Sequence, residues 1–456
     1  MFTNNKSSIV LSALAGSIFA YILVTKDKGA VGIAIVFVCI SLFAVLNYKE
    51  DIGIILQRAF FFVVMTSWFN WRTTFLSFTE LMMGAVFFMF VLKQISSHAN
   101  IRINRHQKRL LFFSCLYVGG GLLCSLYNNI PIGVWVGACL LPFFLLYISI
   151  VLIKSLKEAK TAEFAAKISL YGFAGFTVFA FLTGHAEQIP FHQARGQFTA
   201  IVEFGGIKYM GWANWLGAAV AMAFPMLFLK YLTENKMRFV QGNYLLLLTC
   251  IFLAYRTGTR GCAIGVVTSS TIIFLLSYHK GLFKTNNRLL YLIVPIAIIV
   301  SYSAITVNPV VELKFRLMLE SFGDATLHRQ NLLFTAYENL LSNPIGNGFS
   351  SEWDQYSIDE SNFFTWSANG VGLIGVIGFV GMLITLLHSF IRGLGQSDSK
   401  LRYYSILGIG VLVATIFGAN SSDQILHQAQ TLMPFWLIMG TCFQMSQSGN
   451  NNGLEF

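Results

Sequence analysis

Four arginines near the ends of long apolar runs are the residues best suited to chemistry. Arg195 begins the stretch Arg-Gly-Gln-Phe, Arg256 and Arg260 enclose Thr-Gly-Thr, and Arg329 follows His328. The planar guanidinium fork matches phosphate oxygens, and an arginine at an apolar boundary is costly without an anionic partner. Each one alone could instead extend to lipid headgroups. As a set, they indicate a site for a phosphorylated ligand.

The cysteines and histidines do not form a metal-binding pattern. All 7 cysteines fall inside or at the edge of apolar runs, and no pair of them has metal-ligand spacing. No phosphate-binding glycine loop, dinucleotide-binding glycine motif or GxSxG motif is present. We therefore expect no metal, no cofactor and no direct use of ATP or a nicotinamide.

Composition identifies the elements that must position these arginines. Of the 456 residues, 55% are hydrophobic and 11% are charged, against about 25% charged in a typical soluble domain. This excludes an ordinary soluble enzyme, and a total of 8 prolines argues against a disordered chain. Because a helix needs about 20 apolar residues to cross a bilayer, the chain reads as an integral membrane protein with many spans.

The apolar runs predict an all-α, polytopic transmembrane helix bundle of about 12–14 spans. The candidate spans are at about 8–24, 29–47, 51–67, 75–92, 110–127, 131–153, 167–184, 212–232, 242–256, 260–278, 288–306, 369–391, 402–419 and 428–445. We divide the chain into N-terminal membrane helices (1–184), a first outer loop (185–211), central membrane helices (212–306), a large outer loop (307–366), and C-terminal membrane helices with a polar tail (367–456).

Lysine and arginine placement predicts that both termini are cytoplasmic. The cytoplasmic loops would hold most of the 31 basic residues, including Lys154, Lys157, Lys160 and Lys167. This topology accounts for the net charge of +11, so we expect no nucleic acid as a partner. It also puts all four arginines on the outer side. Within the large loop, residues 331–341 have apolar positions at helical spacing, which predicts a short amphipathic helix at the membrane surface.

Several motifs, in this order and at this length, resemble the O-antigen polymerase and O-antigen ligase superfamily of bacterial inner-membrane glycosyltransferases. Arg195-Gly-Gln-Phe followed by Asn214 is similar to the family's first outer loop, and Thr257-Gly-Thr-Arg-Gly resembles its "TGSRG" segment. Arg329, Phe334, Ala336 and the turn Asn343-Pro-Ile-Gly-Asn-Gly348 resemble a stretch of its large periplasmic loop. The Gly-rich run Gly370–Gly375, which follows that loop, also resembles the family pattern. The resemblance is anchored mainly in residues 190–380.

The resemblance implies a fold like that of type C glycosyltransferases. It also implies transfer of a glycan from an undecaprenyl pyrophosphate carrier at the periplasmic face, without a metal. Arg195, Arg260 and Arg329 would neutralise the leaving pyrophosphate. Arg256, Asn214 and Asn362 are then candidate substrate-binding residues.

The resemblance leaves the general base that would deprotonate the acceptor hydroxyl unassigned. Ligases of this family typically carry a His-Asn pair where this chain has Ser361-Asn362, and an unassisted serine hydroxyl is a poor base near neutral pH. This departure favours a polymerase. His328, Glu338, Asp359 and Glu360 remain candidates for the base.

Three functions stay open. The leading one is polymerisation of lipid-linked repeat units into O-antigen or a related surface polysaccharide. The second is an O-antigen ligase, which would transfer the glycan to lipid A-core or another acceptor. The third, of another class, is a lipid-linked oligosaccharide flippase. The expected partners are the lipid-linked donor, a glycan acceptor and membrane lipids, with a regulator of chain length as a further one.

Overall fold

The structure is a computed structural model. It describes residues 103–153, 156–164, 166–167, 186–188, 200–204, 207–211, 213–233, 247, 250, 260–282, 331, 334–348, 363–418 and 429–447. The predicted spans at 8–24, 29–47, 51–67, 75–92 and 288–306 lie outside these residues, as does almost all of 167–184.

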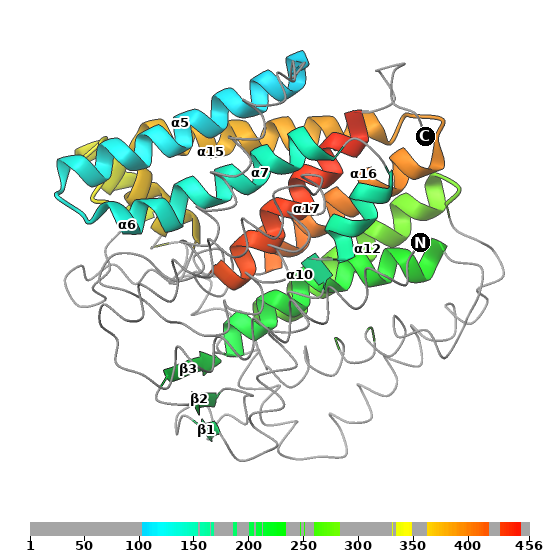
Figure 1. Ribbon diagram of the computed structural model, residues 1–456, viewed down its shortest axis with the longest axis horizontal. Helices are drawn as coiled ribbons and strands as arrows, with labels where there is room; N and C mark the ends of the chain where they lie inside the picture. The colour runs from blue at the N-terminus through cyan, green and yellow to red at the C-terminus, as the bar shows by residue number, and fades with distance from the viewer. Residues whose placement is uncertain are drawn as a thin grey trace, which may run out of the picture.

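Most of the described chain is helical, as Figure 1 shows. The helices are α5 (Arg105–Tyr127), α6 (Ile132–Trp135), α7 (Leu141–Leu152), α10 (Ala213–Thr233), α12 (Arg260–His279), α15 (Phe363–Gly393), α16 (Ser399–Val413) and α17 (Ala429–Gln447). Two π-helical turns, η1 (Val136–Leu140) and η2 (Ala414–Gly418), precede α7 and follow α16. Residues 156–164 and 334–342 are also helical.

Two of these helices, Arg105–Tyr127 and Ala368–Gly393, are long and apolar enough to cross a membrane. They coincide with the predicted spans at 110–127 and 369–391. Two shorter apolar helices, Gly217–Thr233 and Ile264–His279, lie in the predicted spans 212–232 and 260–278. By length and composition the two longer helices could cross a membrane, and the described helices agree with the helical part of the prediction. The full set of spans and the periplasmic placement of the large loop remain predictions.

Among the residues that the structure describes, a small antiparallel sheet departs from the all-α prediction. It has the order β1 (Ala186–Gln188), β2 (Ala200–Phe204), β3 (Ile207–Gly211) and occupies the predicted outer loop 185–211. Phe204 pairs with Ile207, and the two residues between them in the sequence are Gly-Gly. Gly-Gly between two runs rich in β-branched and aromatic residues is a hairpin signal, and this signal was available in the sequence.

Helices α5 and α15 lie side by side, with their backbones in direct contact (Figure 1). A Cβ atom added at Gly378 would lie 2.4 Å from the backbone nitrogen of Tyr117, and one added at Gly120 would lie 2.5 Å from that of Gly375. Small residues at helix–helix interfaces are the usual means of close packing in membranes. The Gly-rich run that follows the large loop therefore continues as the packing face of α15.

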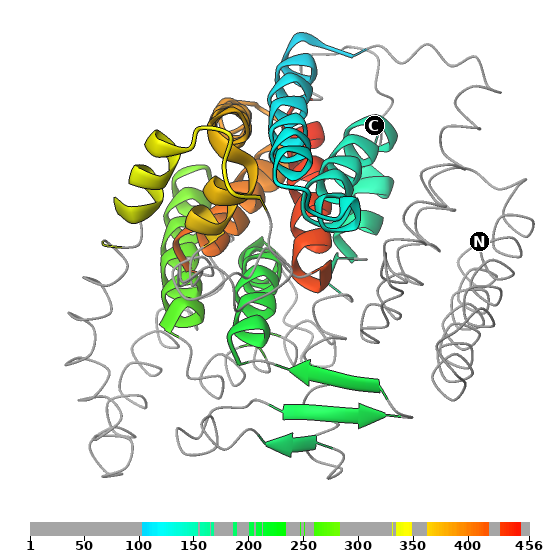
Figure 2. The ribbon, with the colours of Figure 1, turned by 90° about the vertical axis from the view of Figure 1, so that its left-hand side faces the viewer.

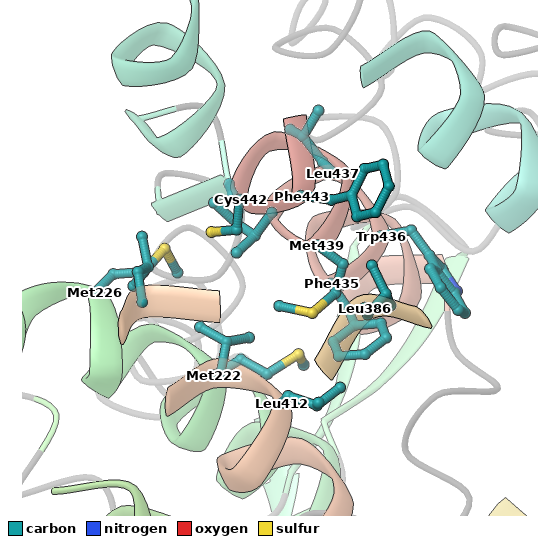
Figure 3. Packing of buried hydrophobic residues seen from close by; sticks show 14 of the residues in the cluster. Met222, Met226, Leu386, Leu412, Phe435, Trp436, Leu437, Met439, Cys442 and Phe443 are labelled. Carbon is teal, nitrogen blue, oxygen red and sulfur yellow. The ribbon is translucent and has the colours of Figure 1, made fainter. Parts of the chain in front are cut away.

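The interior between α10, α15, α16 and α17 is filled with apolar side chains. Figure 3 shows Met222 and Met226 of α10, Leu386 of α15 and Leu412 of α16 converging on α17. This packing brings the last two helices onto the earlier part of the chain and makes the described helices one core.

The helix between residues 156 and 167 contains a buried ion pair. Lys167 Nζ lies 2.7 Å from Glu163 Oε1, and the two side chains are 10% and 7% exposed. Lys167 was predicted as one of the cations of a cytoplasmic loop; the structure adds that it is buried, and the i,i+4 spacing lets Glu163 neutralise it inside the protein.

Two contacts show which helix ends lie together. Arg392 Nη1, near the end of α15, is 2.9 Å from His106 Nε2, near the start of α5. Arg402, near the start of α16, donates to the carbonyl of Lys280, just after α12. The end of α15, the start of α5, the start of α16 and the end of α12 lie at one end of the helical body, which we call the basic end. The opposite end holds the C-terminus of α5 and the N-terminal part of α15, and we call it the turn end.

Candidate functional site

A tight turn at Asn343–Gly348 is the best-defined feature of the large predicted loop. The backbone N–H of Gly346 donates to the carbonyl of Asn343 at 3.0 Å. The Asn343 side-chain nitrogen donates to the carbonyl of Gly346 at 3.1 Å and to Asn347 Oδ1 at 2.9 Å. The predicted Asn-Pro-Ile-Gly-Asn-Gly turn is thus a turn whose shape is fixed by its own side chains.

The turn docks onto a break in α15. At Gly372 the backbone leaves the helical conformation, with φ of 63° and ψ of −174°. The N–H of Leu373 then donates to the carbonyl of Pro344 at 2.8 Å, and the N–H groups of Asn347 and Gly348 donate to the carbonyl of Asn369 at 2.9 and 3.1 Å. An unpaired backbone group in an apolar environment costs several kcal/mol, so the turn and the break satisfy each other.

Glycines at Gly346 and Gly372 make this approach possible. Both have positive φ, which residues with a Cβ adopt only with strain. A Cβ added at Gly372 would lie 2.1 Å from the carbonyl oxygen of Ile345, and one at Gly346 would lie 2.6 Å from that of Asn369. Because both obstacles are backbone atoms, no side-chain rotation could make room.

The C-terminal end of α5 joins the turn as a third element. The side-chain nitrogen of Asn128 donates to the carbonyl of Gly346 at 3.0 Å and to that of Cys124 at 2.8 Å. The Cys124 thiol is fully buried and lies 3.8 Å from the carbonyl of Asn369. The turn 343–348, the break in α15 and the end of α5 are therefore held together, and we call this arrangement the docked turn.

The predicted amphipathic helix of the large loop leads directly into the docked turn. Residues 334–342 are helical, as predicted for 331–341. Ala336 packs inward with 4% exposure, whereas Phe334, Tyr337 and Leu341 are 65%, 59% and 64% exposed. These three lie on one face of the helix by their spacing of three and four. The prediction that this face lies at the membrane surface is not tested by these contacts.

Only three of the predicted site residues belong to the described chain. Glu338 is an exposed residue of the helix 334–342. Arg260 is the first residue of α12 and Asn214 the second residue of α10. For Arg260 and Asn214, the structure describes the backbone but not the side chain. The other seven predicted site residues lie outside the described residues, namely Arg195, Arg256, His328, Arg329, Asp359, Glu360 and Asn362.

The described elements carry these three residues toward the turn end. Helix α12 ends beside Arg402 at the basic end, so Arg260 begins it at the opposite end. Figures 1 and 2 show the sheet next to the start of α10, toward the same end of the helical body as α6 and the docked turn. A shared end is what a common site requires. No described contact joins the three residues directly.

The docked turn was not predicted as a site. The sequence singled out the turn and the Gly-rich run separately, but it gave no sign that Asn128 and Cys124 meet them. An asparagine pair after α5 is a common helix-ending signal, so nothing distinguished Asn128 as a partner of a residue more than two hundred positions away.

The docked turn has a positional role rather than a chemical one. It contributes backbone hydrogen bonds and a buried thiol, with no charged group. Among the described residues, no group of three or more His, Cys, Asp or Glu side chains could hold a metal ion.

Comparison with known proteins assigns neither a family nor a function to the chain. No protein-family model matches the chain, and no curated protein matches its sequence.

Proposed function

We propose that the chain is a membrane glycosyltransferase of the O-antigen polymerase type. It joins undecaprenyl-pyrophosphate-linked repeat units into O-antigen or a related surface polysaccharide at the periplasmic face of the bacterial inner membrane. In the transfer, the bond between the anomeric carbon and the pyrophosphate oxygen breaks. A bond to the acceptor hydroxyl oxygen forms, and the hydroxyl proton passes to a base.

The docked turn is the observation that carries this proposal. The resemblance to the superfamily rests partly on Asn343–Gly348, and this is the segment held by three backbone hydrogen bonds to the break in α15. The turn belongs to the same loop as His328, Arg329 and Glu338. Anchoring that loop to a helix able to cross a membrane would keep its charged residues close to a lipid-linked substrate.

A set of arginines suits the chemistry proposed. Pyrophosphate leaves with developing negative charge, and positioned cations stabilise that charge in the transition state. Arg260, at the start of α12, is the described member of the set, and Arg195 and Arg329 complete it.

The test is the surface glycan of a strain that lacks the protein. A polymerase predicts that the ladder of long chains collapses to one repeat unit on its normal acceptor. Long chains that accumulate on undecaprenyl pyrophosphate would instead identify a ligase. Single units trapped on the carrier at the cytoplasmic face would identify a flippase.

Complementation then tests the arginines. We expect Arg195→Ala and Arg260→Ala to abolish polymer formation while the protein reaches the membrane at normal levels. Lys400→Ala is the matched control, because Lys400 is an exposed cation at the basic end and should leave the ladder unchanged. Wild-type polymer in both arginine variants would contradict the site assignment.

A further inference from the structure

A cluster of basic side chains gathers where the start of α5 meets the end of α15. Arg392 Nη1 is 2.9 Å from His106 Nε2, and the rings of His106 and His388 stack with their centroids 6.2 Å apart. Arg105 and Arg109 also act electrostatically on His106. We call these five residues the basic cluster.

The basic cluster lacks a compensating acid among the residues that the structure describes. The groups that act on His106 there are all Arg or His side chains, and the one ion pair within that part of the chain is Glu163–Lys167. A guanidinium can only donate, so the contact with Arg392 requires an unprotonated Nε2 on His106. With His106 accepting, the positive charge of the cluster comes from Arg105, Arg109 and Arg392, and a bound anion would offset it.

A preference for cytoplasmic lysine and arginine does not by itself explain this arrangement. Basic residues that only set topology can stay apart and hydrated. Here, by contrast, a guanidinium contacts one imidazole, a second imidazole stacks on that ring, and two further arginines stand nearby. The guanidinium of Arg109 lies over the ring of Phe113, 6.0 Å from its centroid, so this cation also stands against an apolar surface.

An exposed apolar column leads up to the cluster on α15. Ile384 and Ile391 are 57% and 56% exposed. They lie on the same helix face as His388, at spacings of four and three residues. On α5, Phe112 is 60% exposed and follows Arg109 by three residues. Cations above an exposed apolar surface match an amphiphile with a phosphate head and hydrocarbon chains.

We propose that the basic cluster binds the headgroup phosphate of an anionic phospholipid, with its acyl chains against Ile384, Ile391 and Phe112. Arg392 and Arg109 donate to the phosphate oxygens. The site is at the opposite end of α5 and α15 from the docked turn. It therefore does not rest on the proposed glycosyltransferase function, and either proposal can fail without the other.

The test is lipid binding by the purified full chain in a neutral detergent, followed by native mass spectrometry and thermal unfolding. Phosphatidylglycerol should bind and raise the unfolding midpoint. Phosphatidylcholine, which has the same chains and no net charge, should bind at least fivefold more weakly. Inorganic phosphate at the same concentration should not reproduce the shift, and an equal shift would overturn the assignment to a lipid.

Variants localise the site. Arg392→Gln and Arg109→Gln should each weaken phosphatidylglycerol binding about fivefold, which corresponds to the roughly 1 kcal/mol expected for one basic residue near an anionic headgroup. Lys400→Gln removes one exposed charge at the same end and should not change binding. Equal losses in Lys400→Gln and the arginine variants, or no loss in either arginine variant, would refute the proposal. Arg109→Gln keeps the test open if Arg392→Gln fails to fold.

Discussion

Replacing Gly372 by alanine should release the docked turn from α15. The backbone at Gly372 has φ of 63° and ψ of −174°, a region that essentially only glycine occupies. A residue with a Cβ is strained there by about 1–3 kcal/mol. The new Cβ would also lie 2.1 Å from the carbonyl oxygen of Ile345 and 2.7 Å from that of Pro344. The substitution therefore penalises the docked state and leaves the undocked state almost unaffected.

The size of the effect follows from that penalty. A strain of about 2 kcal/mol alone shifts the docking equilibrium about 30-fold toward the undocked state, and the overlap with the backbone adds to it. Undocking would break the three backbone hydrogen bonds that join the turn to α15, which contribute about 0.5–1.5 kcal/mol each.

Cys124 reports on undocking. Its side chain is fully buried, and its thiol lies close to Gly346 of the turn. Maleimide labelling, with each cysteine assigned by mass spectrometry, should proceed at least about 30-fold faster at Cys124 in Gly372→Ala than in the unaltered protein. Labelling of Cys442, which is fully buried on α17 near the start of α5 and so at the opposite end from the turn, should not change.

Gly119→Ala is the matched control. An added Cβ there meets no atom within 4 Å, and alanine is favoured over glycine in a helix by up to about 1 kcal/mol. This variant should therefore leave Cys124 protected. If Gly372→Ala labels Cys124 as slowly as Gly119→Ala does, the turn is not held by the break in α15, and the reasoning is refuted.

Three other substitutions test the packing around this site. In Gly378→Ala, the added Cβ would lie 2.4 Å from the backbone of α5. It should force the helices apart at a cost of about 1–3 kcal/mol, seen as a lower thermal unfolding midpoint in detergent. Asn128→Ala removes one of the two side-chain donors to the carbonyl of Gly346, the other being Asn343, so loss of about 0.5–1.5 kcal/mol should speed labelling of the buried thiol roughly two- to tenfold. Glu163→Gln leaves Lys167 buried without its partner and should cost about 3–5 kcal/mol in stability, and adding Lys167→Met should restore most of it. An unchanged midpoint or labelling rate in any of the three would contradict the corresponding contact.

The elements of the fold were predictable where one local signal dominated. Apolar length predicted the helices that contain 110–127 and 369–391, because a long run of apolar residues has few alternatives to a buried or membrane helix. Asn343-Pro-Ile-Gly-Asn-Gly348 predicted a turn, because proline and glycine restrict the backbone locally. The strands at 200–211 were missed although Gly-Gly indicated a hairpin, since the surrounding polar stretch was interpreted as a loop.

The site was predictable only in part. Residue types identified Arg260 and Glu338 as candidates, and their positions on α12 and the helix 334–342 are now described. The partners of the turn were not predictable. Asn128 meets Gly346 across 218 positions of sequence, and no local pattern encodes such a contact. The burial of Lys167 was likewise hidden, because charge alone predicts exposure until a buried partner is found.

By itself, the sequence determined that this chain is rich in apolar helices, contains too few charges for an ordinary soluble enzyme, and carries arginines at the ends of apolar runs. These properties follow from composition and short-range spacing. The tertiary structure alone decided that α15 breaks at Gly372, that the turn 343–348 fills the break, and that Asn128 joins the two. The physical reason is that a break in an apolar helix persists only where another segment supplies its missing backbone hydrogen bonds, and which segment does so is a property of the whole fold.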